Sequence, residues 1–158
     1  MRDGHRRRFW RGTLTGGLAA GILDTFLAMA QYGIGPIIVY QSVASGLLGR
    51  ASYSGGLATV ALGMLLHFFI ATTAAAVYVA TSLRLKLLVE NAVPFGLAFG
   101  VAVYFFMREI VLPLSAARRG PFAWVGLVGH AFCVGLPIAL AARRAHRGGV
   151  QSAGAAGP

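Results

Sequence analysis

The chain has 158 residues, of which 57% are hydrophobic and only 11% are charged. Soluble domains carry about 25% charged residues, so this composition argues against a soluble domain and indicates a chain that lies mostly within a membrane. The formal net charge is +10, but the basic residues gather at the ends of apolar segments rather than among aromatic side chains. We therefore expect no nucleic-acid partner. The single cysteine, Cys133, excludes a disulfide within the chain.

Four apolar segments of about 20 residues or more follow one another along the chain, and an α-helix of that length crosses a hydrocarbon core of about 30 Å. They are Thr13–Tyr32, Gly56–Ser82, Ala92–Leu112 and Phe122–Ala142. The predicted fold is all-α: a polytopic membrane protein with four transmembrane helices and one short interfacial or re-entrant helix. We divide the chain into a basic cytoplasmic N-terminus (1–11), a four-helix transmembrane domain (12–143) and a disordered cytoplasmic tail (144–158).

The N-terminal segment also has features of a signal peptide, because arginines precede an apolar stretch that contains Ala28-Met29-Ala30. Its length and the central Asp24 favour a retained first span. Between the first two spans, Pro36–Leu48 is apolar but too short to cross a bilayer. Proline suits the first turn of a helix and glycine its end, so this segment predicts either a helix lying in the interface or a re-entrant helix that lines a site.

The lysines and arginines outside the spans predict the topology. With four spans, ten of them lie on the side of the termini and three, Arg50, Arg118 and Arg119, on the other side. Positively charged loops stay in the cytoplasm, so we expect both termini to be cytoplasmic in a bacterial inner (cytoplasmic) membrane. The expected partners are the lipid bilayer and either a second copy of the chain or another membrane protein.

Glycine pairs four residues apart occur in the first and third spans, as Gly17 with Gly21 and Gly96 with Gly100. Such pairs let two helices approach closely, so we expect these glycines to face another helix. The two spans run in the same direction, which favours a parallel contact between them; dimerisation through one pair is the alternative. Each half of the chain also reads as a glycine-pair span, a proline and a span with one histidine, which suggests a faint duplication.

Ionisable side chains interrupt every span. At 1.5 Å per residue, Asp24, His67 and His130 lie roughly 12–16 Å from the outer edge, and Arg108 about 6 Å from it. Such groups are costly in hydrocarbon and usually paired, so we expect the first three to converge, with Arg108 capping them. Glu109 should point to a different face. In the plainer interpretation each histidine bonds to a neighbouring group and Arg108 extends outward to the interface.

A converging set of this kind would relay protons or bind a small ligand, because histidine titrates near neutral pH. Alternatively, His67 and His130 could ligate haem iron in a haem- or quinone-associated redox subunit, or join Asp24 around a divalent metal. We expect no resident cofactor or metal and no enzymatic activity, since no nucleophile with an adjacent base occurs.

Four segments carry a resemblance to known sequences: Val43–Gly49, GGLATVALGMLLHFFIA (Gly55–Ala71), VLPLSA (Val111–Ala116) and HAFCVGLPIALAAR (His130–Arg143). Over residues 12–143 the chain resembles a group of uncharacterised small four-helix inner-membrane proteins of bacteria. The resemblance implies an integral membrane protein without an assigned reaction. Proteins of this group often carry asparagine after the methionine of the third span, where this chain has Arg108.

Overall fold

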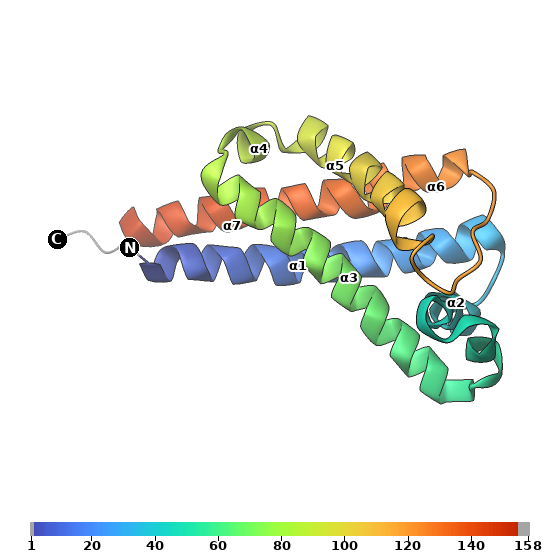
Figure 1. Cartoon of the computed structure of the whole chain (residues 1–158). Coiled ribbons are helices and arrows are strands. Elements are labelled where there is room, and N and C mark those ends of the chain that lie inside the picture. Colours follow the sequence, from blue (N-terminus) through green and yellow to red (C-terminus); the bar gives the residue numbers. More distant parts are fainter. Residues whose placement is uncertain (1, 155–158) are drawn as a thin grey trace.

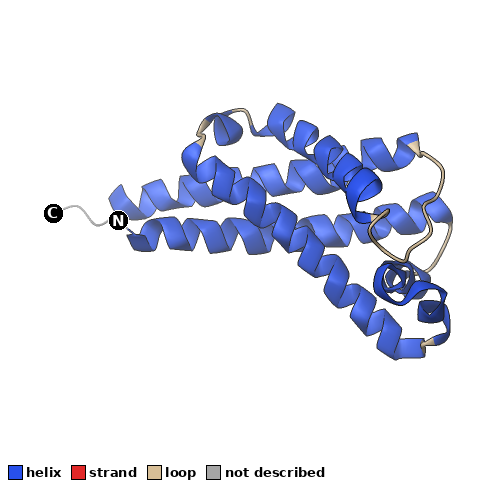
Figure 2. Cartoon of the chain, viewed as in Figure 1, coloured by secondary structure: helices blue, strands red, loops and turns tan. Residues whose placement is uncertain are grey.

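The computed structural model describes residues 2–154, and every element in that range is helical (Figures 1 and 2). The longer helices are α1 (Arg2–Tyr32), α3 (Gly56–Arg84), α5 (Ala92–Phe106) and α7 (Leu136–Gly154). The shorter ones are α2 (Pro36–Leu48), α4 (Leu87–Glu90), α6 (Trp124–Gly129), the 3₁₀ helix η1 (Gly49–Ser54) and the π-helical segments η2 (Met107–Val111) and η3 (His130–Gly135).

Among the described residues, four helical stretches are long and apolar enough to cross a membrane. They are Gly4–Tyr32, Gly56–Arg84, Ala92–Val111 and Trp124–Arg147. The predicted all-α fold with four candidate spans is therefore confirmed. Large apolar side chains such as Leu57 and Phe69 are exposed on the protein surface, as expected where lipid rather than water covers it. The start of α1 and the end of α7 lie at the same end of the bundle (Figure 1).

Of the two predicted terminal segments, only the C-terminal tail differs from the structure. α1 begins at Arg2, so the basic N-terminal residues continue the helix of the first span. The tail was predicted to lack regular structure from residue 144, yet α7 runs to Gly154; residues 155–158 lie outside the described part of the chain. Alanine and arginine favour helix strongly, and their density after Pro137 is sufficient reason for the helix to continue.

The glycine pairs pack against neighbouring antiparallel helices, so the predicted contact between the first and third spans is wrong. A Cβ added to Gly17 would lie 2.6 Å from Thr72 Cα on α3, and one added to Gly21 would lie 2.7 Å from the Phe68 ring. On α5, a Cβ at Gly96 would lie 2.7 Å from Ala139 Cβ on α7, and one at Gly100 would clash with the backbone of η3. In each half of the chain, the glycine-pair helix therefore packs on the histidine-bearing helix that follows it.

Two π-helical segments interrupt the spans, and each lies just before a proline. Pro113 and Pro137 have no N–H, so the carbonyl groups of Glu109 and Cys133, four residues earlier, lose their usual partner. In η2 the Leu112 N–H bonds instead to the Met107 carbonyl oxygen at 2.8 Å, a bond across five residues. Such π turns change the angular phase of the residues around them, and they often occur at functional sites.

The short helix α2 lies across the bundle: Figure 1 shows it nearly end-on while α1 and α7 run across the picture. It begins with Pro36, as predicted, and is followed by Gly49 at φ +58°, a conformation that favours glycine. Its buried face packs on α3, where an added Cβ at Gly63 would clash with the Tyr40 carbonyl. The helix runs crosswise to α1 and α7, and its face away from α3 contributes to a cavity.

Candidate functional site

Asp24 of α1 and His130 of η3 lie within ion-pair distance, with Asp24 Oδ1 3.7 Å from His130 Nε2, a separation longer than a direct hydrogen bond. The other ring nitrogen, Nδ1, lies 2.8 Å from the carbonyl oxygen of Gly126. A carbonyl oxygen only accepts hydrogen bonds, so Nδ1 carries a hydrogen. The ring nitrogen that faces the Asp24 carboxylate is therefore Nε2, which the Gly126 carbonyl leaves free.

Tyr104 of α5 fixes the other side of the imidazole. Its ring lies edge-on to the His130 ring with 5.4 Å between centroids. The phenol donates to the Ala123 carbonyl at 3.2 Å and accepts from the Ala123 N–H at 3.3 Å, and Phe122 packs edge-on against the same ring. The loop before α6 thus holds Tyr104 in place, and Tyr104 in turn limits the orientations open to His130.

Glycines of α6 let α1 approach close enough for the Asp24–His130 contact. A Cβ added to Gly126 would lie 3.2 Å from Tyr104 and 3.3 Å from Gln31, and one added to Gly129 would clash with Leu27. Larger residues at these positions would push α1 away from α6. These glycines therefore help to position the pair.

Arg108, in η2, interacts with the loop before α6 rather than with Asp24. Its Nη1 donates to the carbonyl oxygens of Gly120 at 3.3 Å and Pro121 at 3.1 Å, and its guanidinium lies 5.3 Å from the centroid of the Phe122 ring. The side chain is largely buried, with 15% exposed. Arg108 thus extends toward the end of the bundle away from the termini, which agrees with the plainer interpretation.

Glu109 does not point away from Arg108, contrary to the prediction. Arg108 Nε lies 3.3 Å from Glu109 Oε1, and Arg119 pairs with the other carboxylate oxygen. In a regular α-helix adjacent residues point about 100° apart. The wider π turn of η2 and the length of both side chains allow them to meet.

His67 of α3 belongs to a separate cluster. Its Nε2 lies 2.8 Å from the carbonyl oxygen of Gly21 and 3.3 Å from Thr25 Oγ1. The Thr25 hydroxyl donates to the same carbonyl at 2.9 Å, so the Tyr40 hydroxyl, 3.3 Å away, donates to Thr25. The imidazole therefore joins α1, α2 and α3 through hydrogen bonds and serves as a structural group.

The predicted convergence of Asp24, His67 and His130 is therefore only partly seen. The structure brings Asp24 and His130 into contact, while His67 bonds to Gly21 and Thr25. Asp24 and Thr25 are adjacent on α1, so their side chains point about 100° apart. One level of the bundle thus contains two clusters on different sides of α1.

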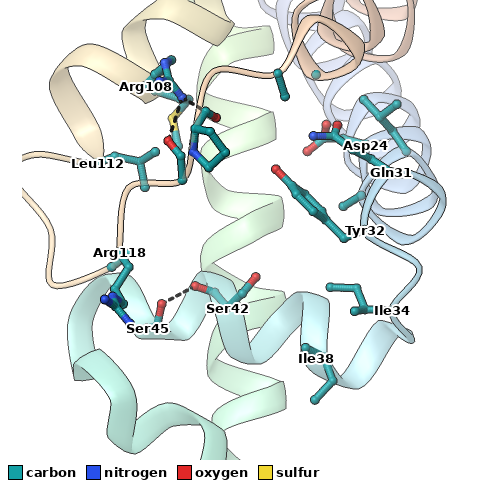
Figure 3. A pocket seen from close by; sticks show the side chains of 18 of the residues that line it. Asp24, Gln31, Tyr32, Ile34, Ile38, Ser42, Ser45, Arg108, Leu112 and Arg118 are labelled. Atoms are coloured by element: carbon teal, nitrogen blue, oxygen red, sulfur yellow. Dashed lines mark hydrogen bonds between the residues drawn. The ribbon is translucent and has the colours of Figure 1, made fainter.

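A cavity of about 780 Å³ lies beside the Asp24–His130 pair, at the end of the bundle away from the termini. Figure 3 shows Asp24, Gln31 and Tyr32 of α1 on one wall and Arg108 and Arg118 across from them. The charged residues that line the cavity are the basic Arg50, Arg108 and Arg118 and the acidic Asp24. Uncharged polar groups come from Gln31, Tyr32, Ser42, Ser45, Tyr53 and Tyr104. The apolar walls include Leu27, Ile34, Ile38 and Leu112.

Sequence reasoning missed most residues of this cavity, including two arginines and the tyrosine beside His130. Arg50 and Arg118 were counted only as loop charges for topology, and Tyr104 was not considered. The available signal for Tyr104 was a hydroxyl group within an apolar span, one turn after Gly100. No comparable signal marked the arginines, because only the three-dimensional path of the loops brings them to one cavity.

The geometry gives no support to the haem interpretation. His67 uses Nε2 for the Gly21 carbonyl, and His130 uses Nδ1 for the Gly126 carbonyl while its Nε2 faces Asp24, so the two rings have different partners. Within residues 2–154, no group of three or more histidine, cysteine, aspartate or glutamate side chains is placed to hold a metal ion.

Comparisons with models of protein families, with curated proteins and with solved structures found no match for this chain.

Proposed function

We propose that this protein is a small multi-pass membrane protein that binds a small organic anion in the cavity beside Asp24 and His130, called here the outer cavity, together with one proton carried by either residue of this pair. The observation that carries the proposal is the placement of this pair on the wall of a cavity of about 780 Å³ that also contains three arginines. Asp24 and His130 thus serve to bind the ligand and its proton, and they catalyse no reaction.

The proton count follows from the hydrogen bonds. With one proton on either Nε2 or the carboxylate, the pair is neutral overall. Without that proton, Nδ1 still carries its hydrogen for Gly126, and the pair has a charge of −1 from Asp24. An anion in the cavity is repelled by the second state, so binding of the anion favours uptake of one proton.

The charges of the cavity favour an anion over a cation. Arg50 and Arg118 are exposed and line the cavity, and Arg108 adds a third guanidinium that is partly compensated by Glu109. Guanidinium groups bind carboxylate and phosphate through paired hydrogen bonds. The apolar wall formed by Ile34, Ile38 and neighbouring residues suits a ligand with both an acidic group and an apolar part.

The excess of basic residues on the side of the termini supports a topology with both termini in the cytoplasm of a bacterial cell. The cavity then opens on the outer side of the inner membrane. A bound anion and proton would reach the site from outside the cell membrane, which is the arrangement needed for proton-linked uptake or sensing of a weak acid.

Binding of benzoate, acetate and inorganic phosphate to the full chain in nanodiscs tests the proposal. We expect benzoate to raise the melting temperature, more where the pair is protonated than where it is deprotonated in a pH series, and the double variant Arg50→Gln/Arg118→Gln to lose the effect. The double variant Asp24→Asn/His130→Gln should retain binding and lose its pH dependence, because neither substituted side chain can take up the proton.

Glu90→Gln provides the matched control, since Glu90 is an exposed carboxylate on α4 and does not line the cavity. This control should behave like the unmodified protein. Anion binding that is absent, or that survives loss of both arginines, would contradict the proposed site.

A further inference from the structure

A second groove, separate from the outer cavity, runs between α1 and α7. Its volume is about 550 Å³. The residues that line it are Arg11, Thr15, Ala19 and Leu23 of α1, Phe132 of η3, and Leu136, Pro137, Leu140, Ala141, Arg144 and Ala145 of α7. We propose that this groove binds one anionic phospholipid of the leaflet next to the termini, with the phosphate at Arg11 and Arg144 and an acyl chain along the apolar wall.

The groove exists because α1 and α7 meet along a seam of small residues. A Cβ added to Gly16 would lie 3.2 Å from Ile138 Cα and 3.3 Å from Ala141 Cβ, and one added to Gly12 would lie 3.5 Å from Ala145 Cβ. The two helices therefore lie side by side at close range (Figure 1). Beside this seam, small side chains such as Ala19 leave space that longer ones would fill.

The length of the groove matches one leaflet. Arg11 and Leu23 are twelve residues apart on α1, which corresponds to about 18 Å of helix. On the facing side of the groove, Phe132 of η3 and Arg144 of α7 are also twelve residues apart. Half of a hydrocarbon core of about 30 Å is about 15 Å, so the groove extends from the headgroup level to the bilayer centre.

The charges select the headgroup. Arg11 and Arg144 are both exposed, and the described residues that line the groove include no aspartate or glutamate. Basic pockets between transmembrane helices at the cytoplasmic side recognise anionic lipid headgroups, and guanidinium groups bind phosphate with well-defined geometry. The Thr15 hydroxyl already donates its hydrogen to the Arg11 carbonyl at 2.6 Å, so the two arginines are the groups that bind the phosphate.

The apolar part identifies the ligand as a lipid rather than a free phosphate. Leu23 and Phe132, at the far end from the arginines, are exposed apolar side chains that a soluble anion would not reach. An acyl chain that begins at the arginines fills this length and removes the apolar wall from contact with disordered neighbouring lipid. The site does not depend on the outer cavity, whose lining shares no residue with it.

Native mass spectrometry of the full chain, purified in neutral detergent and titrated with dioleoyl-phosphatidylglycerol or dioleoyl-phosphatidylcholine, tests this site. We expect one phosphatidylglycerol to be retained at lipid concentrations where phosphatidylcholine is not. The double variant Arg11→Gln/Arg144→Gln should bind phosphatidylglycerol at least roughly tenfold more weakly than the unmodified protein, because two phosphate contacts are lost. The single variants should show intermediate losses, which keeps the test informative if the double variant does not fold.

Two further variants separate charge from shape. Arg84→Gln/Lys86→Gln removes the same charge from the connection after α3, outside the groove, and should leave retention within about twofold of the unmodified protein. Ala19→Phe leaves the charge unchanged but fills the groove, and should reduce retention as strongly as loss of the arginines. Equal retention of both lipids, an effect of the control as large as that of the groove arginines, or full retention by Ala19→Phe would each overturn the proposal.

Discussion

At the scale of single residues, the contact between Asp24 and His130 distinguishes this chain from an ordinary helical bundle. Ionisable groups inside apolar spans could be identified in the sequence because hydrocarbon offers them no solvation. Their depths could be calculated from the helical rise. Their angular positions could not, because one residue along a helix changes the direction by about 100°, and the π turns η2 and η3 shift the phase of Arg108 and His130 further.

A double-mutant cycle tests which residues act as partners. Asp24→Asn combined with His130→Gln should show a coupling free energy of about 0.5–3 kcal/mol, as residues in contact do. Asp24→Asn combined with Arg108→Gln should show less than about 0.5 kcal/mol, because Arg108 interacts with Glu109 and the loop carbonyls instead. The free energies of unfolding can be measured by titration with sodium dodecyl sulfate in mixed micelles. A larger coupling of Asp24 to Arg108 than to His130 would contradict the assigned pairing.

The role given to His67 is structural, and it leads to a different expectation. Replacing His67 with Phe removes its hydrogen bond to the Gly21 carbonyl and should lower the unfolding free energy by about 1 kcal/mol. Anion binding in the outer cavity should stay unchanged, because His67 does not line it. Loss of binding in a variant that remains folded would show that the two clusters act together.

At the scale of helices, the sequence allowed the glycine pairs to be recognised as close-packing positions but gave the wrong partners. A glycine pair indicates that some backbone comes near; it carries no information about which helix supplies it. The structure also adds Gly63 and Gly135, which have no GxxxG spacing. An added Cβ at Gly135 would clash with the backbone at Gly96. Gly135 and Gly96 therefore face each other across the α5–η3 contact.

The nature of the neighbouring atoms predicts the cost of alanine at each glycine. At Gly100 the added Cβ meets the backbone of η3, which cannot move without shifting His130, so Gly100→Ala should destabilise by about 1–3 kcal/mol. At Gly21 it meets the end of the Phe68 ring, which can rotate, so Gly21→Ala should cost less. Gly120→Ala, in open space, is the control. Unfolding in mixed micelles gives the order, and a greater cost at Gly21 than at Gly100 would contradict the packing described.

At the scale of the whole molecule, composition and segment length were sufficient to predict an all-α chain with four candidate spans, because the bilayer fixes the length of a crossing helix. The two sites were beyond sequence reasoning. The outer cavity forms where α1, α2, η2 and the loop before α6 come together, and the α1–α7 groove depends on which small residues face each other.

The topology can be tested with reporter fusions. A fusion after Arg147 should show cytoplasmic activity and a fusion at Ser54 the activity of the outer side, because basic residues are concentrated near the termini. Fusions that report opposite sides for Arg8 and Arg147 would contradict an even number of spans. Fusions that report an inverted orientation would place the outer cavity on the cytoplasmic side.

The central claim is that an anion and one proton bind together at the Asp24–His130 pair. Calorimetric titration of benzoate into the full chain, repeated in buffers of different ionisation enthalpy, measures the protons taken up per bound anion. At a pH where the pair is deprotonated, we predict an uptake that approaches one proton per bound anion in the unmodified protein and in Glu90→Gln, and none in the double variant Asp24→Asn/His130→Gln. Binding without proton uptake, or equal uptake by this double variant, would contradict the claim.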